Sequence, residues 1–288
     1  NIYYNKENMD VSLRQTYETE KYIADTILSN LGDTKNVWDY DIEKYRAVGE
    51  FELSDEQIQI LDVVCKNNIA ILNGFAGSGK TASTQGLIKM LKDNDKSFRL
   101  FSPTGRAAKV LAENTNEPSS TIHRGLGYVP PNQWAFNTEQ PLACDIVIVD
   151  EFSMVDIWLF KKLLDAIDFR YTKLLMIGDN AQLPSVSCGN LLHDFMEANI
   201  IPTVTLNKIF RYSSGGLMRV APDSRCCKSY LDNSMKDTAT TFGDNGDYMF
   251  IDLASELIPK NVAIEGEIGV ISGVEEDIVA DQEVAADY

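Results

Sequence analysis

A glycine-rich stretch carries the residue types needed to bind a phosphate chain. Residues 74–81 read Gly-Phe-Ala-Gly-Ser-Gly-Lys-Thr, which fits the P-loop pattern Gly-x-x-x-x-Gly-Lys-Ser/Thr. Glycines let the backbone wrap closely around phosphate oxygens, and the N-terminus of the following helix adds partial positive charge. We expect Lys80 to reach the β- and γ-phosphates of ATP, and Thr81 to ligate Mg²⁺. The other nucleotide contacts predicted in this loop are Gly74, Ala76, Gly77, Ser78 and Gly79.

Two carboxylates follow an apolar run about 70 residues further on. Residues 145–149 read Asp-Ile-Val-Ile-Val, and Asp150 and Glu151 come directly after them. Ligands of parallel sheets bind at the carboxyl ends of the strands, so both groups should face the phosphate site. Asp150 would hold Mg²⁺ through water, and Glu151 would orient or deprotonate the water that attacks the phosphate. The alternative is a pair of surface carboxylates that cap the next helix.

A third apolar run ends in polar residues. Residues 174–184 read Leu-Leu-Met-Ile-Gly-Asp-Asn-Ala-Gln-Leu-Pro. The end of this strand should lie beside the same site, where the amide of Gln182 could sense the γ-phosphate or the attacking water. An ordinary polar loop is the alternative interpretation.

The elements that position these motifs follow a regular rhythm. Strands are predicted at residues 69–73, 98–102, 145–149 and 173–177, alternating with helices at 80–93, 105–113 and 157–167. Such alternation indicates an α/β fold with a mainly parallel sheet. Ser54 is a plausible N-cap for a helix over residues 57–65. Residues 1–50 are rich in helix formers, and we expect one or two helices there in an accessory segment.

Composition limits the possible functions. The 288 residues suffice for about two domains. The net charge of −17 argues against strong non-specific DNA binding, which needs many cationic contacts to phosphates. The acidic excess lies mainly after residue 231, where 14 acidic residues face two lysines. Between Gly74 and Arg124, by contrast, eight Lys and Arg outnumber four Asp and Glu.

The sequence shows no pattern that predicts association with a membrane. No apolar run approaches the roughly 20 residues that a membrane span needs, and residues 1–10 lack a secretory pattern. The five cysteines are odd in number and form no Cys-x-x-Cys pair, so reduced thiols are expected and zinc is not. We therefore expect a cytoplasmic protein.

Taken in order, the motifs between Leu53 and Tyr212 resemble those of superfamily 1 DNA helicases of the RecD-like, 5′→3′ branch. Besides the P-loop, the stretches that carry the resemblance are residues 53–57 (the adenine-reading glutamine motif), 102–109 (motif Ia), 120–124 (a DNA-contact motif), 150–154 (motif II), 178–184 (motif III) and 206–211 (motif IV). Six motifs in family order make coincidence improbable.

The resemblance implies a RecA-like P-loop sheet and hydrolysis of ATP between two such lobes. Gln57 would select adenine, and Arg211 would face the γ-phosphate. Single-stranded DNA and single-strand/duplex junctions would be the substrates, in DNA repair or recombination, with the protein acting either alone or as a subunit of a recombination complex. The DNA contacts implied are Pro103, Thr104, Arg106, Lys109, Thr121, His123, Arg124 and Trp134.

Some of these contacts have simpler interpretations. Thr104, Arg106 and Lys109 could belong to an ordinary solvated helix start, and His123 could be a structural hydrogen-bonding residue. Aromatic residues and turn formers near residues 127–141 predict a hairpin insertion. In related helicases a hairpin here splits the duplex, so Trp134 or Phe136 could stack on a base. Alternatively, the hairpin packs its aromatics on its own domain.

The chain departs from the family after Arg211. Motifs V and VI of a second motor domain are not found, although residues 217–221 and 265–271 resemble its start and a strand of its SH3-like insertion. We therefore divide the chain into residues 1–50, a first ATPase domain at 51–205, and a partial second domain with its insertion at 206–288. Either the chain is truncated or residues between joined segments are absent, and we favour the second. Two alternatives to a helicase stay open: a P-loop phosphotransferase acting on a small molecule, and a regulatory ATP-binding module.

Overall fold

The structure is a computed structural model, which describes residues 2–4, 11–32, 36–49, 51–208, 239–242 and 248–251. The chain divides into one compact unit that ends at Arg211 and a second that begins at Tyr212. In the second unit, strands β13 (Ala239–Phe242) and β14 (Tyr248–Ile251) pair antiparallel. The predicted partial motor domain and its SH3-like insertion fall mostly outside the described residues.

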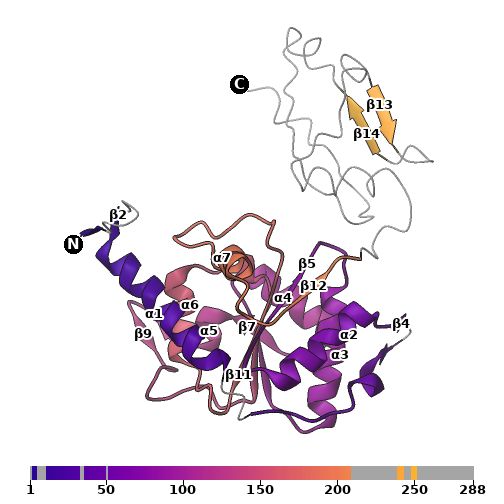
Figure 1. Cartoon of the computed structure of the whole chain (residues 1–288), viewed down its shortest axis with the longest axis horizontal. Coiled ribbons are helices and arrows are strands. Elements are labelled where there is room, and N and C mark those ends of the chain that lie inside the picture. The colour runs from indigo at the N-terminus through magenta and orange to yellow at the C-terminus, as the bar shows by residue number, and fades with distance from the viewer. Residues whose placement is uncertain are drawn as a thin grey trace. The chain divides into compact units, whose positions relative to one another are not determined.

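A six-stranded parallel sheet forms the centre of the first unit (Figure 1). In spatial order its strands are β12 (Thr203–Leu206), β5 (Ile69–Gly74), β11 (Lys173–Gly178), β10 (Ile146–Val149), β6 (Phe98–Ser102) and β7 (Ser119–Thr121). Every neighbouring pair is parallel. The predicted α/β fold with a parallel P-loop sheet is therefore confirmed.

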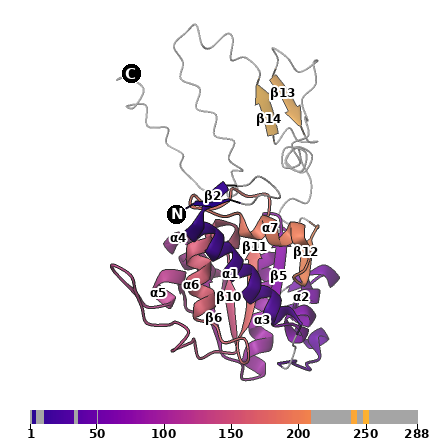
Figure 2. The same cartoon turned by 60° about the vertical axis from the view of Figure 1, so that its left-hand side comes forward.

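Helices cover both faces of this sheet (Figures 1 and 2). One face carries α2 (Asp55–Lys66), α3 (Lys80–Asp93) and α4 (Gly105–Thr115). The other carries α1 (Arg14–Leu31), α5 (Ile122–Gly125), α6 (Ile157–Asp165) and α7 (Leu191–Ala198). Because both faces are covered, the central strands β5, β11 and β10 are mostly apolar rather than alternating with polar residues.

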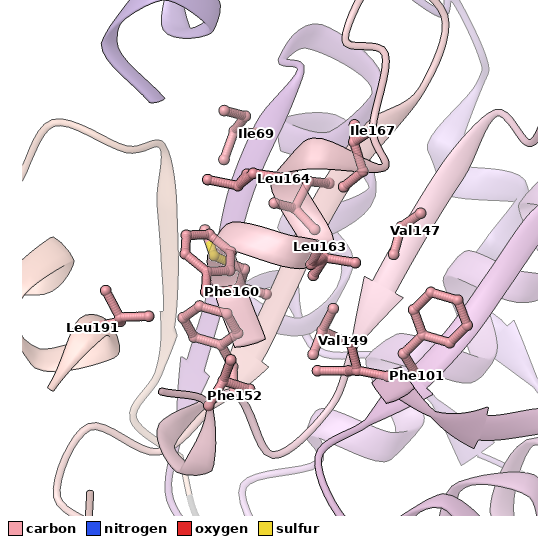
Figure 3. Close-up of a cluster of buried hydrophobic side chains, with 14 of the residues drawn as sticks. Ile69, Phe101, Val147, Val149, Phe152, Phe160, Leu163, Leu164, Ile167 and Leu191 are labelled. Carbon is pink, nitrogen blue, oxygen red and sulfur yellow. The ribbon is translucent and has the colours of Figure 1, made fainter. Parts of the chain in front are cut away.

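The strand β10 shows how the two cores share one sheet. Val147 and Val149 point into the core beneath α6, which Figure 3 shows with Phe160 and Leu163. Ile146 and Ile148 alternate with them and enter the core beneath α2 and α3. All four β10 side chains are fully buried. At about 2 kcal/mol for each buried aliphatic side chain, this strand alone contributes substantially to folding.

The smaller elements either lie at the edges of the sheet or precede its first strand in the sequence. They are β1 (Ile2–Tyr4), β2 (Val11–Leu13), the 3₁₀ turns at Ile42–Tyr45 and Phe152–Met154, and the short strands β3 (Ala47–Val48), β4 (Phe51–Glu52), β8 (Tyr128–Val129) and β9 (Gln133–Trp134). Among the described residues, no helix is long and apolar enough to cross a membrane.

The N-terminal segment packs directly on the sheet domain. Helix α1 lies beside α6 in both views (Figures 1 and 2), and the Tyr22 hydroxyl donates to Asp165 Oδ1 at 2.7 Å. Burial and the neighbouring carboxylate raise the pKa of Tyr22 to about 12. Ile23 and Ile27 are buried in the same core as α6, so α1 completes the cover of that face.

A lysine is buried at the amino end of β11. The side chain of Lys173 is only 1% exposed, and its Nζ donates to the carbonyls of Cys65 and Asn67 at 3.3 and 2.9 Å. The Trp38 ring centroid lies 4.8 Å from Nζ, close enough for a cation–π contact. Burial lowers the pKa of Lys173 to about 8 from 10.5. The ammonium therefore holds Trp38 against the sheet through the cation–π contact.

We predict that this lysine makes folding stability rise with pH. In the unfolded chain Lys173 loses its proton near pH 10.5, but in the folded protein it does so near 8. The unfolded state therefore holds more protons between these values, and stability increases as pH rises through that window. The expected gain is about 2 kcal/mol between pH 8 and 9.5, at about 1.4 kcal/mol per unit.

The control for this prediction is Lys173→Met, compared with the wild type by urea denaturation at each pH. The buried thiols Cys65 and Cys144 have pKa values raised to about 11, so both stay protonated in the two folded proteins between pH 8 and 9.5 and cancel in the difference, although Lys173 lowers the pKa of Cys65. A wild-type minus mutant difference that does not change with pH would contradict the assignment.

Candidate nucleotide-binding site

The glycine loop lies between β5 and α3, as its phosphate role requires. Gly77 and Gly79 have φ angles of 81° and 89°, in the left-handed region that residues with a Cβ adopt at a cost. A Cβ added at Gly74 would lie 2.5 Å from Ser78 Oγ and 3.0 Å from Leu206 Cβ. The sequence folds this way because glycine alone meets both demands, and α3 then begins directly at Lys80.

Lys80 is held against its own loop. Its Nζ donates to the carbonyls of Gly74 and Phe75 at 2.7 and 3.1 Å. The ammonium therefore already lies inside the turn that would wrap a phosphate chain. Such a lysine can exchange carbonyl oxygens for phosphate oxygens without a large movement of the backbone.

The carboxylates after β10 open onto the same cavity. It measures 580 Å³, within the usual range for a small-molecule site. The residues predicted from the motifs that line it are Ala76, Gly77, Gly79, Lys80, Thr81, Asp150, Glu151 and Gln182. The parallel register brings them together, because β5, β11 and β10 are neighbours and end at one edge. The predicted contacts Gly74, Ser78 and Gln57 are buried and do not line the cavity.

Charge and burial define the electrostatics of this edge. Burial raises the pKa of Asp150, and the nearby Lys80 only partly offsets that effect. The pKa of Glu151 is also raised, first by burial and then by the negative charges of Asp150 and Asp179, with Lys80 again opposing. A cation would stabilise the ionised carboxylates, and the oxygen donors of Asp150 and Thr81 are those that Mg²⁺ prefers. The residues present therefore fit a magnesium ion.

Two hydrogen bonds connect the third motif to the first two. The Asn180 amide donates to Asn73 Oδ1 at 3.1 Å, which ties the loop after β11 to the end of β5. Ser153 Oγ donates to Gln182 Oε1 at 3.5 Å. Gln182 is thus oriented from the residues that follow Glu151. The sequence motifs gave no indication of either contact, because both join residues more than 25 positions apart.

Gln57 is engaged within the protein. Its Oε1 accepts from the Ser54 amide at 2.9 Å, and the Ser54 hydroxyl accepts from the Gln57 amide, which together form a capping box. Its Nε2 donates to the Ser78 carbonyl at 3.2 Å, and the side chain is 4% exposed. The residue therefore connects the start of α2 to the glycine loop, while its adenine-reading role stays a prediction.

The motif reasoning missed eight lining residues: Phe75 in the glycine loop, Ala82, Thr84 and Gln85 on α3, Val110, Leu111 and Asn114 on α4, and Phe51 on β4. Phe51 and Val110 are 46% and 47% exposed. Only the tertiary structure reveals them, because no local pattern relates β4 to α4.

The predicted DNA contacts gather at the carboxyl ends of β6 and β7. These strands are neighbours, with Ser102 opposite Thr121. Thr104 and Thr121 are N-caps: their hydroxyls accept from the amides of Ala107 and Arg124, each at 3.2 Å. Exposed cationic or basic side chains surround these caps, namely those of Arg106, Lys109, His123 and Arg124. Pro103 lies between β6 and Thr104, so one surface holds all of these residues.

The aromatics of the hairpin pack on one another. The hairpin predicted near 127–141 contains the antiparallel pair β8 and β9. The Trp134 ring centroid lies 4.7 Å from that of Tyr128 and 5.6 Å from that of His123. Lys162 Nζ lies 5.9 Å from the Trp134 ring. The arrangement matches a hairpin packed on its own domain, and contact of Trp134 or His123 with DNA stays a prediction.

The remaining predicted residue cannot be placed. Arg211 lies outside the described residues, as do residues 217–221 and 265–271. Motif IV is described only over residues 206–208, where the backbone amides of Asn207 and Lys208 donate to Glu56 Oε2 at 3.0 and 3.4 Å. Glu56 thereby ties the end of β12 to the start of α2.

A family model and several known proteins match this chain. The sequence model of a family described as "AAA domain" matches residues 52–225. The chain is 35% identical over 162 residues to the ATP-dependent RecD2 DNA helicase of Deinococcus radiodurans, covering 56% of this chain and 22% of that protein. It is 30% identical over 181 residues to the RecBCD enzyme subunit RecD of Haemophilus influenzae, covering 54% and 28%.

Among solved structures, the chain is similar to the Pif1 helicase from Candida albicans, with a TM-score of 0.41 and 27% identity over 55% of this chain and 40% of that one. The parallel sheet and the family match establish the fold independently of this likeness. The chain spans about a quarter of the length of the two curated relatives.

We predict that the backbone at Glu151 stores strain. Its φ and ψ of 54° and 40° lie in the left-handed region, which costs a non-glycine residue about 1–2 kcal/mol. Asparagine tolerates this region better, so Glu151→Asn should raise the free energy of unfolding by about 1 kcal/mol. Thermal or urea denaturation measures the change.

The matched control is Glu151→Ala, which removes the same charge beside Asp150 but keeps a residue poorly suited to this backbone. The alanine variant should therefore be less stable than the asparagine variant. Equal stabilities for the two variants would show that the gain comes from charge and not from the backbone.

Proposed function

We propose that this chain, which belongs to the AAA domain family and is similar to RecD-type helicase proteins, hydrolyses ATP to drive a helicase along single-stranded DNA. The observation that carries the proposal is the cavity at the carboxyl edge of the sheet. There the P-loop lysine, two carboxylates and the amide of Gln182 converge from three neighbouring strands. This is the set of groups that phosphoryl transfer to water requires.

The proposed chemistry uses the groups where they stand. Lys80 would exchange the carbonyls of Gly74 and Phe75 for phosphate oxygens and stabilise the charge that develops on them. Glu151 would orient the attacking water and take its proton as the bond from phosphorus to the leaving ADP oxygen breaks. Burial and the charges of Asp150 and Asp179 raise the pKa of Glu151, which favours acceptance of a proton. Gln182 would hold the same water or the γ-phosphate.

Thr81 and Asp150 would hold the magnesium ion. Both line the cavity, with Thr81 at the first turn of α3 and Asp150 directly after β10. When bound, Mg²⁺ neutralises charge on the phosphates and fixes their orientation. Arg211 would act on the γ-phosphate from the segment after β12.

Single-stranded DNA would cross the surface formed at the ends of β6 and β7. Arg106, Lys109 and Arg124 present positive charge there, and the hydroxyls of Thr104 and Thr121 lie among them. Contacts of this kind hold the sugar-phosphate backbone and do not read bases. The surface belongs to the same sheet edge as the ATP site, so movement in one can be passed to the other through short strand ends.

The remaining parts of the proposal concern the helicase as a whole. We propose translocation in the 5′→3′ direction, with Trp134 and the hairpin placed at the single-strand/duplex junction. A second motor lobe would close on the ATP site, and the protein would act in DNA repair or recombination, alone or as a subunit of a recombination complex. A cytoplasmic location stays a prediction.

The first test replaces the P-loop lysine. Lys80→Ala should lower kcat for ATP hydrolysis at least about 100-fold, because one of the charges that stabilise the transferred phosphoryl group is removed. Phosphate release with Mg²⁺, with and without single-stranded DNA, measures it. Lys66→Ala is the control, since Lys66 is exposed on α2 and pairs with Asp62. Activity that survives in the Lys80 variant would overturn the proposed site.

The second test concerns the DNA surface. Arg106→Ala should weaken binding of single-stranded DNA equally for all sequences and reduce the salt dependence of log K by about 0.7, the loss of one phosphate contact. Fluorescence anisotropy at several salt concentrations measures both. Arg170→Ala is the control, because Arg170 is also exposed but lies before β11, at the opposite edge of the sheet. If the two variants behave alike, the DNA path lies elsewhere.

A further inference from the structure

A buried asparagine lies near the carboxyl end of the strand that leads into the glycine loop. Strand β5 reads Ile-Ala-Ile-Leu-Asn-Gly, so Asn73 is the polar residue of an otherwise apolar run. It is 5% exposed. Strands β11 and β12 flank it at Gly178 and Thr205, so its backbone is held from both sides. A buried amide costs free energy unless it is hydrogen-bonded, so its partner indicates its role.

The partner of Asn73 lies in the loop after β11. The backbone amide of Asn180 donates to Asn73 Oδ1 at 3.1 Å. This loop begins at Gly178, the direct neighbour of Asn73 in the parallel register. A Cβ added at Gly178 would lie 2.6 Å from Leu192 Cδ2 and 3.3 Å from the Ser153 amide nitrogen, so β11 ends in close contact with its surroundings. The loop therefore starts at a fixed place, within reach of Asn73.

Residues 179–182 form a turn that carries Gln182. The Gln182 amide donates to the Asp179 carbonyl at 3.0 Å, and the Ala181 amide donates to Asp179 Oδ1 at 3.1 Å. A side chain that bonds the backbone two residues on stabilises such a turn. The four residues are thus joined into one unit. Because Asn180 lies within this unit, its bond to Asn73 also restrains the position of Gln182.

The chain beyond Gln182 gives this residue little support. Leu183 is 86% exposed, and Val186 is fully exposed. The side chain of Gln182 is held by the Ser153 hydroxyl, which donates to its Oε1 at 3.5 Å, a long hydrogen bond. The place of Gln182 in the cavity lining therefore depends on the turn before it, and the turn is tied to Asn73.

Asn73 also stands directly before the glycine loop. The carbonyl of the next residue, Gly74, accepts from Lys80 Nζ at 2.7 Å. The last two residues of β5 therefore contact both the lysine proposed to bind the phosphates and the turn that presents Gln182. This connection runs through one side chain and one backbone carbonyl, both at the carboxyl edge of the sheet.

We propose that Asn73 is a positioning residue for ATP hydrolysis, which holds the 179–182 turn so that Gln182 meets the γ-phosphate or the attacking water. The inference rests on the proposed ATP site and deepens it. Asn73 does not line the cavity and acts through Gln182. It therefore contributes to the hydrolysis step and not to the binding of a nucleotide that has no γ-phosphate.

The first test replaces the amide with an apolar side chain of similar size. Asn73→Leu should lower kcat for ATP hydrolysis about 10-fold or more, because a catalytic group misplaced by about 1 Å can cost up to about 100-fold in rate. It should leave the affinity for ADP with Mg²⁺ unchanged, since that ligand offers Gln182 no γ-phosphate. Phosphate release and isothermal calorimetry on the full chain measure the two quantities.

Two results of this test would overturn the proposal. Weakened ADP binding would show that the substitution distorts the glycine loop itself, and a wild-type kcat would show that Asn73 has no part in the reaction. Thermal denaturation checks that the variant is folded. If the leucine variant is unfolded, Asn73→Ala takes its place, because it removes the same acceptor without adding methyl groups.

A double-mutant cycle with Gln182→Ala tests the route of the effect. If Asn73 acts through Gln182, Asn73→Leu should lower kcat no further once residue 182 is alanine. A merely structural asparagine would instead lower kcat by the same factor in both backgrounds. That additive result would contradict a positioning role.

Asn68→Leu is the matched control. Asn68 is also a buried asparagine, at 4% exposed, but it lies directly before β5, at the opposite end of the strand. Its side-chain nitrogen donates to the Asn30 carbonyl at 3.5 Å, far from the cavity lining in the sheet. The substitution should leave kcat and ADP affinity unchanged. An equal loss of kcat in this variant would assign the effect to the removal of any buried amide and reject the proposal.

Failure of the proposed function gives a different pattern. A wild-type chain that does not hydrolyse ATP, or a Lys80→Ala variant that hydrolyses it normally, would remove the phosphate site itself. An active wild type, an inactive Lys80→Ala variant and an unchanged Asn73→Leu variant would together remove only the positioning role of Asn73.

Discussion

The parallel hydrogen-bonded register of the central sheet is the constraint on which the rest of the structure depends. Because β5, β11 and β10 are neighbours and all run in the same direction, the glycine loop, the Gln182 loop and the carboxylates after β10 emerge at one edge. A shift by one residue would exchange the side chains that face the two cores. The same apolar packing that fixes the register therefore also fixes the distances among the phosphate-binding groups.

Bringing these groups together raises the free energy of the folded state, and contacts in the surrounding structure offset that cost. Asp150 and Glu151 have raised pKa values because they are buried close together with little compensating charge, and Glu151 adopts a left-handed backbone. Such strain persists where neighbours determine the conformation, and it clusters at functional sites. Here Phe152, fully buried directly after Glu151, anchors the turn in the core beneath α6.

The segments outside the sheet stabilise this edge. Helix α1 completes the core on one face, and residues 36–49 and 51–53 lie on the other, held by Trp38, Lys173 and the contacts of Arg46. The second segment ends at the capping box of α2, whose Gln57 reaches the glycine loop at Ser78. A change far from the phosphates along this segment can thus alter the geometry of the loop that binds them.

The sequence by itself determined the sheet strands, the glycine loop and the paired carboxylates. These are local features: apolar runs, glycines and polar strand ends are written within a few consecutive residues, and the alternation of strands with helices then implies the shared edge. The tertiary structure alone decided which side chains are already engaged. Gln57 is tied to Ser78, Trp134 packs against Tyr128, and Phe51 and Val110 line the same cavity. These pairings follow from how helices and hairpins pack on the sheet, where partners are set by shape and burial and leave no periodic trace in the chain.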